Sequence, residues 1–571
     1  MRPHSRNSSV RFLLAGLLTL VSACEPSSPS STTAGQPNPP SPPRSQSEDR
    51  VYQVGRKIKD FPEAADLSTP ETTVAARVQA IVRGESWRRL LTKRAAALGY
   101  GVSGGQPLPA PYARWWLNQE ILEVQVHGGT RAAVYRWQPN FWGAWFGASF
   151  LELRDGQWLD DSRGGEYSGI QFARAEFSRW CRYREQENAR RAPVKDPEGH
   201  LEPFVSFLRA EGQDPQAYVL QALADHQLVI MGEVHHRPRY WAFNASLVEA
   251  AAFPRHVGVI YLEQPWGHQA LVDQFLSSPQ LDPQPLITVL RDTVLTGWPD
   301  QPMLDFFITV WKVNRSLPPE QKLRLVLVDP HPVWRNVDDR LDIVLSDQFR
   351  DQRMAKVILK DLRAHRDDRR HGLFIVGMVH APLDVSGYDG SPVVTAGSRL
   401  RQELGTHAVC AIHQHRPVRF SGAERLERPA LGLFDSAFAA LQFRPIAFPL
   451  NHGPFGQVLL DEFQDTRLST TNSYRDAFSA YLYLGPLETE LFSPLIPGFY
   501  TDDFVRELER RHQVRSGKRL AKGASPPRFD GASYTALMSR EWGQPRAAWS
   551  ATRLGPLTKW HQGLPEDTAN P

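Results

Sequence analysis

The sequence predicts an α/β fold with a mainly parallel sheet covered by helices on both faces, preceded by a smaller tryptophan-rich α+β domain. Six short, unbroken apolar runs lie between residues 226 and 484, and helical stretches separate them. Eight of the 16 tryptophans lie between residues 50 and 195, where strand-like alternation replaces these runs. The chain has 571 residues, which is room for about two to four domains at roughly 150 residues each.

Composition limits the class of protein. Hydrophobic residues make up 41% of the chain and charged residues 22%. These are ordinary values for globular proteins, so wholesale disorder and a multi-span membrane protein are excluded. Sixty-six Lys and Arg against 62 Asp and Glu leave a net charge of +4. We therefore expect no nucleic acid as a partner, because domains that bind it are usually strongly basic.

The N-terminus has the pattern of a signal peptide over residues 1–23. Arg2, Arg6 and Arg11 precede an apolar run from Phe12 to Val21. As a helix this run is about 15 Å long, half of the ~30 Å that the core of a bilayer requires. We therefore predict a removed targeting segment, not a membrane-spanning anchor.

The residues at the end of that run resemble the lipobox of bacterial lipoproteins. Val21-Ser22-Ala23-Cys24 places small residues before a cysteine, and the resemblance implies that Cys24 is lipidated and becomes the new N-terminus. Residues 24–49 are rich in Pro and Ser and are predicted to form an extended tether. We expect a protein anchored through Cys24 in the bacterial cell envelope, at the outer membrane or the periplasmic face of a membrane. The alternative is an ordinary signal peptide with an incidental cysteine.

Residues 50–195 are predicted to form the smaller α+β domain. A helical pattern spans residues 73–97, and segments with period-two alternation follow at residues 121–128, 132–137 and 145–159. We expect most tryptophans of this domain in its core, with an aromatic contact surface as the alternative. Residues 190–197 are predicted to be a linker.

Residues 198–490 are predicted to form the larger α/β domain. Helical stretches such as residues 240–253 and 348–366 separate its apolar runs. Hydrophobic strands that alternate with helices are typical of parallel sheets, which bind ligands outside the carboxyl ends of their strands. The expected strands are residues 226–231, 257–262, 323–328, 372–377, 408–412 and 480–484.

Acidic residues and histidines follow five of these six strands. Residues i and i+2 share one face of an extended segment, so some of them can present two groups to one crevice. Carboxylate and imidazole groups suit general acid–base chemistry or metal ligation. In chain order the candidates are Glu233 and His235, Glu263, Asp329 and His331, His380, and His413 and His415.

Six short motifs in a fixed order resemble a known superfamily. They are GEVHHRP at 232–238, Glu263, TGWP at 296–299, RDQRMA at 350–355, FIVGMVHAPL at 374–383 and AYLYLGPL at 480–487. Their order resembles the superfamily that joins erythromycin esterases, ChaN-type haem-binding lipoproteins and TIKI/TraB proteases. The resemblance is closest to the ChaN lipoproteins and covers about half of the chain, roughly residues 200–490.

The resemblance implies which residues are functional. Glu233, Glu263 and His380 match the motifs of the superfamily, together with one histidine after Glu233. The ChaN and TIKI pattern, Glu/Thr-x-His, falls on His235, and the erythromycin esterase pattern, Glu-x-x-His, falls on His236. In a metal-dependent variant, Glu233, His235 and His380 would hold Mn, Fe, Co or Zn.

The sequence leaves three functions open. The favoured one is a Glu/His-dependent hydrolase of esterase or metal-dependent peptidase type, acting on a small molecule or a peptide. No G-x-S-x-G elbow in the sequence supports a serine mechanism. The alternative is haem or iron binding without catalysis, as in ChaN-like lipoproteins. The third is an envelope interaction module that uses the tryptophan-rich domain as its contact surface.

The C-terminal extension, residues 491–571, is basic in part. The stretch 506–522 is rich in Arg and Lys with interspersed Glu, which predicts a solvated helix that runs into a loop. Contact with nucleic acid or anionic lipid is the minor alternative. Cys181 and Cys410 are expected to be buried free thiols.

Overall fold

The computed structural model describes most of the chain from residue 49 onward. The predicted signal peptide, Cys24 and the tether up to residue 48 lie outside the described residues. Described are residues 49–62, 67–92, 107–108, 110–140, 143–161, 166–167, 170–190, 193–338, 342–343, 349–368, 370–386, 391–417, 428–460, 472–516, 530–540, 542–544 and 559–562.

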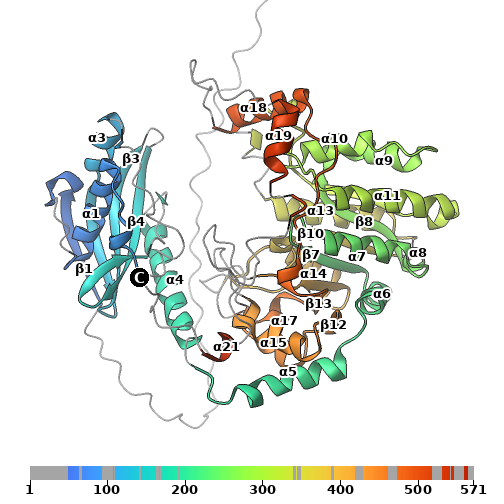
Figure 1. Cartoon of the computed structure of the whole chain (residues 1–571), viewed down its shortest axis with the longest axis horizontal. Helices are drawn as coiled ribbons and strands as arrows, with labels where there is room; N and C mark the ends of the chain where they lie inside the picture. Colours follow the sequence, from blue (N-terminus) through green and yellow to red (C-terminus); the bar gives the residue numbers. More distant parts are fainter. Residues whose placement is uncertain are drawn as a thin grey trace, which may run out of the picture. The chain divides into compact units, whose positions relative to one another are not determined.

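The N-terminal part is built on an antiparallel sheet (Figure 1). Its strands are ordered β1-β2-β3-β4-β5, and β6 pairs with β4. Helix α1 packs on one face, and α4 packs on the other through Phe177 and Trp180. The predicted α+β class is confirmed. The elements are β1 (Arg50–Lys57), α1 (Pro70–Arg83), α3 (Ala110–Leu117), β2 (Glu120–His127), β3 (Arg131–Asn140), β4 (Gly143–Arg154), β5 (Gln157–Asp160), β6 (Glu166–Tyr167) and α4 (Ile170–Arg190).

The larger part is built on a seven-stranded sheet in the order β12-β13-β11-β7-β10-β8-β9. Every described pair of strands in it is parallel except β12 with β13. The sequence missed β12, which has only four residues and lies at the edge. The strands are β7 (Leu228–Glu233), β8 (Val257–Pro265), β9 (Arg324–Asp329), β10 (His371–Gly377), β11 (Val409–Gln414), β12 (Ile446–Pro449) and β13 (Ala480–Tyr483).

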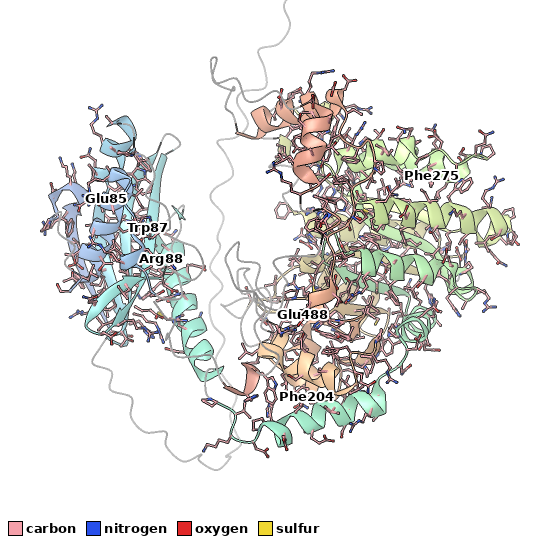
Figure 2. All side chains as sticks on the ribbon, in the orientation of Figure 1. Glu85, Trp87, Arg88, Phe204, Phe275 and Glu488 are labelled. Atoms are coloured by element: carbon pink, nitrogen blue, oxygen red, sulfur yellow. The ribbon has the colours of Figure 1, made fainter. Side chains whose placement is uncertain are left out.

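Helices cover both faces of this sheet, as the sequence predicts. One hydrophobic core contains Phe204 of α5, and the other contains Phe275 of α9 (Figure 2). Residues along each strand alternate between the two cores, so the strands are apolar throughout. The helices are α5 (Pro197–Glu211), α6 (Pro215–Asp225), α7 (Pro238–Glu249), α8 (Phe253–His256), α9 (Gln269–Ser277), α10 (Gln284–Asp292), α11 (Gln301–Ser316), α13 (Arg350–Ala364), α14 (Ala396–Leu404), α15 (Leu433–Ala440), α16 (Gly453–Gln457), α17 (Tyr474–Ala477), α18 (Asp502–Ser516), α19 (Gly531–Met538) and α21 (Lys559–Gln562).

Several helices begin at residues that satisfy their first backbone N–H groups. The side chains of Asp196, Asp214 and Asp300 accept such hydrogen bonds at the starts of α5, α6 and α11, and each is followed by a proline in the first turn. Short 3-10 turns connect other elements: η1 (Ile58–Asp60), η2 (Arg88–Leu90), η3 (Trp266–His268), η4 (Pro319–Gln321), η5 (Trp334–Asn336), η6 (Met378–His380), η7 (Pro429–Gly432) and η8 (Leu487–Thr489).

The start of the C-terminal extension packs into the larger part. Phe504 and Leu508 of α18 join the core that contains Phe275. Arg511 is buried and its Nη2 pairs with Asp292 Oδ1 at 2.6 Å. The prediction of a solvated helix is therefore wrong for this face of α18. Its expected continuation, residues 517–522, lies outside the described residues.

The two cysteines of the described chain behave as predicted. Cys181 and Cys410 are buried free thiols. Burial raises the pKa of each thiol to about 12, so both are protonated at neutral pH. Among the helices that the structure describes, none has the length and apolar character needed to cross a bilayer.

Candidate functional site

Four strands of the larger sheet end side by side with polar groups at their carboxyl ends. β10 lies between β7 and β8, and β9 pairs with the other edge of β8. A cavity of about 80 Å³ opens at this edge. Its described lining comprises Glu233, His235, Trp241, Glu263, Gln264, Thr293, Val294, Trp298, Met303, Asp329, Arg350 and Ile375.

Glu233 and His235 form a hydrogen-bonded pair in the wall of the cavity. Nδ1 of His235 lies 2.5 Å from Oε1 of Glu233. The Glu233 side chain is 9% exposed and that of His235 is 47% exposed, so the carboxylate is enclosed and the imidazole reaches the opening. The edge of His235 also packs on Trp298, with ring centroids 4.6 Å apart. The carboxylate therefore sets the orientation of the ring.

Glu263 is held by three groups from different segments. Its Oε2 accepts the backbone N–H of Gly377 at 2.5 Å, and its Oε1 accepts Nη2 of Arg350 at 2.6 Å. Nε2 of His380 lies 3.4 Å from the same Oε1. A Cβ on residue 377 would lie 3.0 Å from Oε2 of Glu263 and 3.1 Å from Cε1 of His235. Glycine at this position therefore lets the two side chains approach the strand end.

Arg350 is a residue of the candidate site that strand-end reasoning missed. It opens α13, and its Nε and Nη2 bind the two oxygens of Asp329 at 2.9 and 2.7 Å. Together with the bond to Glu263, this guanidinium links the ends of β8 and β9. The only sequence signal for it was the RDQRMA motif, since its partners lie 21 and 87 residues away.

His380 lies at the end of η6 and joins the cluster from the side of α13. Its Nδ1 donates to Oδ1 of Asp351 at 2.8 Å. The same oxygen accepts the backbone N–H of Ala396 at 2.7 Å, at the start of α14. We call Glu233, His235, Glu263, Asp329, Arg350, Asp351 and His380 the polar cluster. The predicted residues Glu233, His235, Glu263 and His380 thus lie together.

Charges within the polar cluster change the pKa values of its members. Desolvation lowers the pKa of His235, but the charge of Glu233 and its hydrogen bond outweigh this, so the pKa is raised above 6.5. Desolvation also opposes the protonation of His380, yet Glu263 and Asp351 raise its pKa to about 10. Burial would raise the pKa of Glu263, but His380 and Arg350 hold it well below its usual range. Glu263 and His380 are therefore both charged at neutral pH.

His236 points away from the cavity. Its backbone has a φ of 64°, which turns the chain after His235. Its ring contacts Trp298, Phe492 and Trp542, with centroids 4.4, 5.3 and 4.6 Å away, and its Nδ1 lies 3.3 Å from Oδ2 of Asp300. Desolvation lowers its pKa despite Asp300. Of the two patterns open from the sequence, the structure places Glu-x-His, and not Glu-x-x-His, at the cavity.

Comparisons with known proteins give structural matches alone. No protein-family model matches the chain, and a search of curated proteins finds no match. Similar solved structures include a succinoglycan biosynthesis protein, with 9% identity, a TM-score of 0.36, and coverage of 50% of this chain and 96% of that one. An erythromycin esterase, EreC, has 13% identity, a TM-score of 0.31, and coverage of 47% and 92%.

ChaN of Campylobacter jejuni, in a structure with cofacial haem binding, is also among the matches. It has 12% identity, a TM-score of 0.25, and coverage of 36% of this chain and 88% of that one. The esterase and ChaN represent two of the branches that the sequence motifs resemble.

The predicted metal ligands do not fit a metal ion in this arrangement. Glu233 and Nδ1 of His235 bind each other, which leaves only Nε2 of His235 for a metal, and the two nitrogens of His380 face Asp351 and Glu263. Nη1 of Arg350 lies 3.4 Å from Nε2 of His380, so a cation already stands where a metal would have to approach. In the described part of the chain, no group of three His, Cys, Asp or Glu side chains is placed to hold a metal.

Haem binding stays a prediction. The cavity of about 80 Å³ has room for two or three water molecules at ~30 Å³ each. Pockets that enclose cofactor-sized ligands are usually about 300–1,000 Å³. Haem would therefore have to bind elsewhere or after the cavity widens.

The remaining strand-end histidines do not join the polar cluster. His331 follows β9, but its ring turns toward Trp334 and its Nδ1 lies 3.1 Å from the carbonyl oxygen of Pro332. His413 and His415 are fully buried and face the core that contains Phe204. Their rings pack among Tyr474, Phe478, Tyr481, Phe438 and Tyr483. The expectation that they share the crevice with Glu233 is wrong.

Proposed function

We propose that the chain is a hydrolase in which His235, oriented by Glu233, takes a proton from water. The observation that carries this proposal is the 2.5 Å contact between Glu233 Oε1 and His235 Nδ1 at the wall of a cavity. Holding Nδ1 directs Nε2 toward the reaction, and the carboxylate stabilises the imidazolium that forms. A buried carboxylate behind a half-exposed imidazole is a common arrangement for a general base.

The reaction balances without a cofactor. A water molecule gives one proton to Nε2 of His235, and its oxygen attacks the carbonyl carbon of the substrate. The bond to the leaving group then breaks, and the leaving group receives that proton from His235. Arg350 lines the cavity and places positive charge near the oxyanion that develops on the carbonyl. Protonated His380 pairs with Glu263, the carboxylate that binds Arg350.

The cavity limits which part of a substrate reaches the polar cluster. A volume of about 80 Å³ accepts the scissile group but not a large acyl or peptide side chain. The larger portion of the substrate would therefore lie outside the opening next to His235. Carboxylic esters and peptide bonds both fit this description, and they share the tetrahedral oxyanion that Arg350 would stabilise.

The assay for this proposal uses the purified full-length protein, a panel of p-nitrophenyl esters and fluorogenic peptides, and a chelator. We expect hydrolysis that persists with EDTA and is lost in Glu233→Gln. Hydrolysis that EDTA abolishes and one added metal restores would contradict the metal-free mechanism. Equal hydrolysis by Glu233→Gln would contradict the role of the pair.

We also propose that the protein acts at the cell envelope through a lipid on Cys24. The apolar run before Cys24 and the Pro/Ser-rich segment after it support this localisation. The test is fractionation of cells that express the full-length chain or its Cys24→Ser variant, with labelled palmitate. Labelling and membrane recovery should both be lost in Cys24→Ser. Membrane recovery of the unlabelled variant would contradict lipid anchoring.

A further inference from the structure

A second and larger hollow lies between α13 and α14. It has a volume of about 620 Å³, nearly eight times that of the cavity at the polar cluster. Its described lining comprises Gln352, Lys356, Leu359, Lys360 and Arg363 from α13 with Arg399 and Glu403 from α14. We call it the basic groove. Nothing in the proposed hydrolytic reaction uses these residues.

The basic groove carries excess positive charge. Arg363 and Arg399 each pair with Glu403, at 3.6 and 3.1 Å. Lys356 and Lys360 are exposed, and within the described residues neither has an ion-pair or hydrogen-bond partner. Four cations and one carboxylate thus face one hollow. Like charges gathered in this way repel one another, and a bound anion would relieve the repulsion.

The cations of α13 are arranged in a line. Residues 352, 356, 360 and 363 lie on one face of the helix, because residues three and four apart are neighbours. Lys356 and Lys360 are separated by about 6 Å along the axis at ~1.5 Å per residue. In an extended peptide, side chains two residues apart point the same way at a separation of about 6.6–6.8 Å. Carboxylates at every second position of an extended chain therefore match the spacing of the lysines.

A smaller hollow continues the basic groove. It has a volume of about 270 Å³ and shares Gln352 and Arg399 with the groove. Its other described lining has five apolar residues, Leu383, Val385, Pro392, Val393 and Val394, and also the polar residues Asp384, Ser398 and Gln402. Asp384 would repel a carboxylate, so the acidic positions of a ligand belong on the side of Lys356 and Lys360. Charge on one side and apolar surface on the other suit a peptide better than a uniform polyanion, since a peptide can present both kinds of side chain.

We propose that the basic groove binds an acidic peptide segment in an extended conformation, with carboxylates at alternate positions facing Lys356 and Lys360. Helix α13 carries Arg350 and Asp351 at its start and the groove residues from Gln352 onward, so one helix joins both sites. The binding itself does not depend on hydrolysis.

The test is binding of fluorescein-labelled 12-residue peptides to the full-length protein, followed by anisotropy. One peptide alternates Glu and Ser, and its control repeats Glu-Glu-Ser-Ser with the same composition. The variant is Lys356→Glu/Lys360→Glu, and its matched control is Lys312→Glu/Lys322→Glu, which changes the net charge equally at exposed lysines elsewhere. All four lysines are exposed, so melting temperatures should stay close to that of the wild type.

We expect the alternating peptide to bind more tightly than its control. The groove variant should weaken binding by at least about tenfold, because two attractive contacts become repulsive, while the matched control changes it little. Binding should weaken above ~0.1 M salt, where the Debye length falls below about 10 Å. Glu233→Gln should bind the peptide as the wild type does. Loss of hydrolysis with intact binding would therefore concern the proposed function alone.

Three results would overturn the proposal. The first is equal weakening by the groove variant and the matched control. The second is equal affinity for the two peptides, which would show that the spacing of the Glu residues does not matter. The third is tighter, Lys356- and Lys360-dependent binding of polyphosphate or phosphatidylglycerol vesicles, which would make the occupant a different anion.

Discussion

Histidines lie at the carboxyl ends of both β7 and β11, but their surroundings differ. The two strands are neighbours, and both place histidine and other polar groups at the carboxyl edge. His235 after β7 is 47% exposed and bound to a carboxylate in a cavity wall. His413 in β11 is fully buried among aromatic rings, and so is His415 just after it. Position at the functional edge of a sheet is therefore not enough to make a site.

Two features separate these regions. The first is the face of the sheet on which the side chains lie. His413 and His415 pack with Tyr481 and Tyr483 in the core that contains Phe204, on the face opposite the cavity. The second is the place of the ion pair beside the histidine, at a cavity in one region and inside the protein in the other. Arg350 holds Glu263 and Asp329 together at the cavity, whereas Arg428 pairs with Asp435 beside His415 inside the protein. We conclude that the first region is suited to chemistry and the second to stability.

The largest expected effect concerns the pair at the cavity. Replacing Glu233 by Gln removes the charge that orients His235, and hydrolysis should fall about 10²- to 10⁴-fold, the usual contribution of general-base catalysis. His235→Gln should cause a loss of similar size. The measurement is kcat/KM on whichever ester or peptide the wild type hydrolyses. Circular dichroism and urea unfolding would check that both variants fold.

Arg350→Met should affect both activity and stability. It removes positive charge from the cavity and takes one charged partner each from Glu263 and Asp329. We expect about 10²-fold lower kcat/KM, as for loss of one oxyanion donor, and about 2–3 kcal/mol lower free energy of unfolding. Arg350→Lys keeps the charge but loses the planar guanidinium that binds two carboxylates at once, so its activity should be intermediate. Full activity in Arg350→Met would show that the cation has no role in the reaction.

His415→Phe should change stability alone. Nδ1 of His415 lies 2.8 Å from the hydroxyl of Tyr481, and its Nε2 lies 3.5 Å from Asp435. The substitution removes both contacts, although Asp435 keeps its ion pair with Arg428, and it should lower the free energy of unfolding by about 1–3 kcal/mol. Urea unfolding would measure the loss. A drop in kcat/KM beyond about twofold at full folding would contradict the assignment of this region to stability.

The smallest effect is a change of pH profile. His235 acts as a base when it is neutral, and its pKa is raised above 6.5, so kcat/KM should rise with pH above that value. The profile should fall again near pH 10 as His380 loses its proton. In Glu233→Gln the residual rise should occur at lower pH, because the charge that raises the pKa of His235 is gone. A rise of kcat/KM at the same pH in Glu233→Gln and the wild type would contradict the effect of Glu233 on the pKa of His235.

The pKa shifts of His380 and Glu263 also make the free energy of unfolding depend on pH. The raised pKa of His380 contributes stability that is fully present below pH 6.5 and is lost as pH rises through about 10. The lowered pKa of Glu263 contributes stability above about pH 4.5 that is lost as the pH falls and the carboxylate becomes protonated. Urea unfolding across this range should show both losses. The loss at low pH should be smaller in Arg350→Met than in the wild type, because Arg350 is one of the groups that lower the pKa of Glu263.

The sequence predicted the parallel sheet well because strands buried on both faces are apolar throughout. It also predicted Glu233, Glu263 and His380, since the end of a strand is visible in the chain. It could not decide between His235 and His236, which depends on the φ of 64° at His236. It missed Arg350 as a site residue and misplaced His413, because both outcomes depend on contacts between distant segments.

The most direct measurement compares three proteins in one assay. Wild type, Glu233→Gln and His413→Phe are assayed on the ester and peptide panel with EDTA present, at equal concentrations of folded protein. We expect hydrolysis by the wild type, its near-complete loss in Glu233→Gln, and its retention in His413→Phe, which keeps an aromatic ring in the buried region. Equal activity of Glu233→Gln, or hydrolysis of no member of the panel by the wild type, would contradict it.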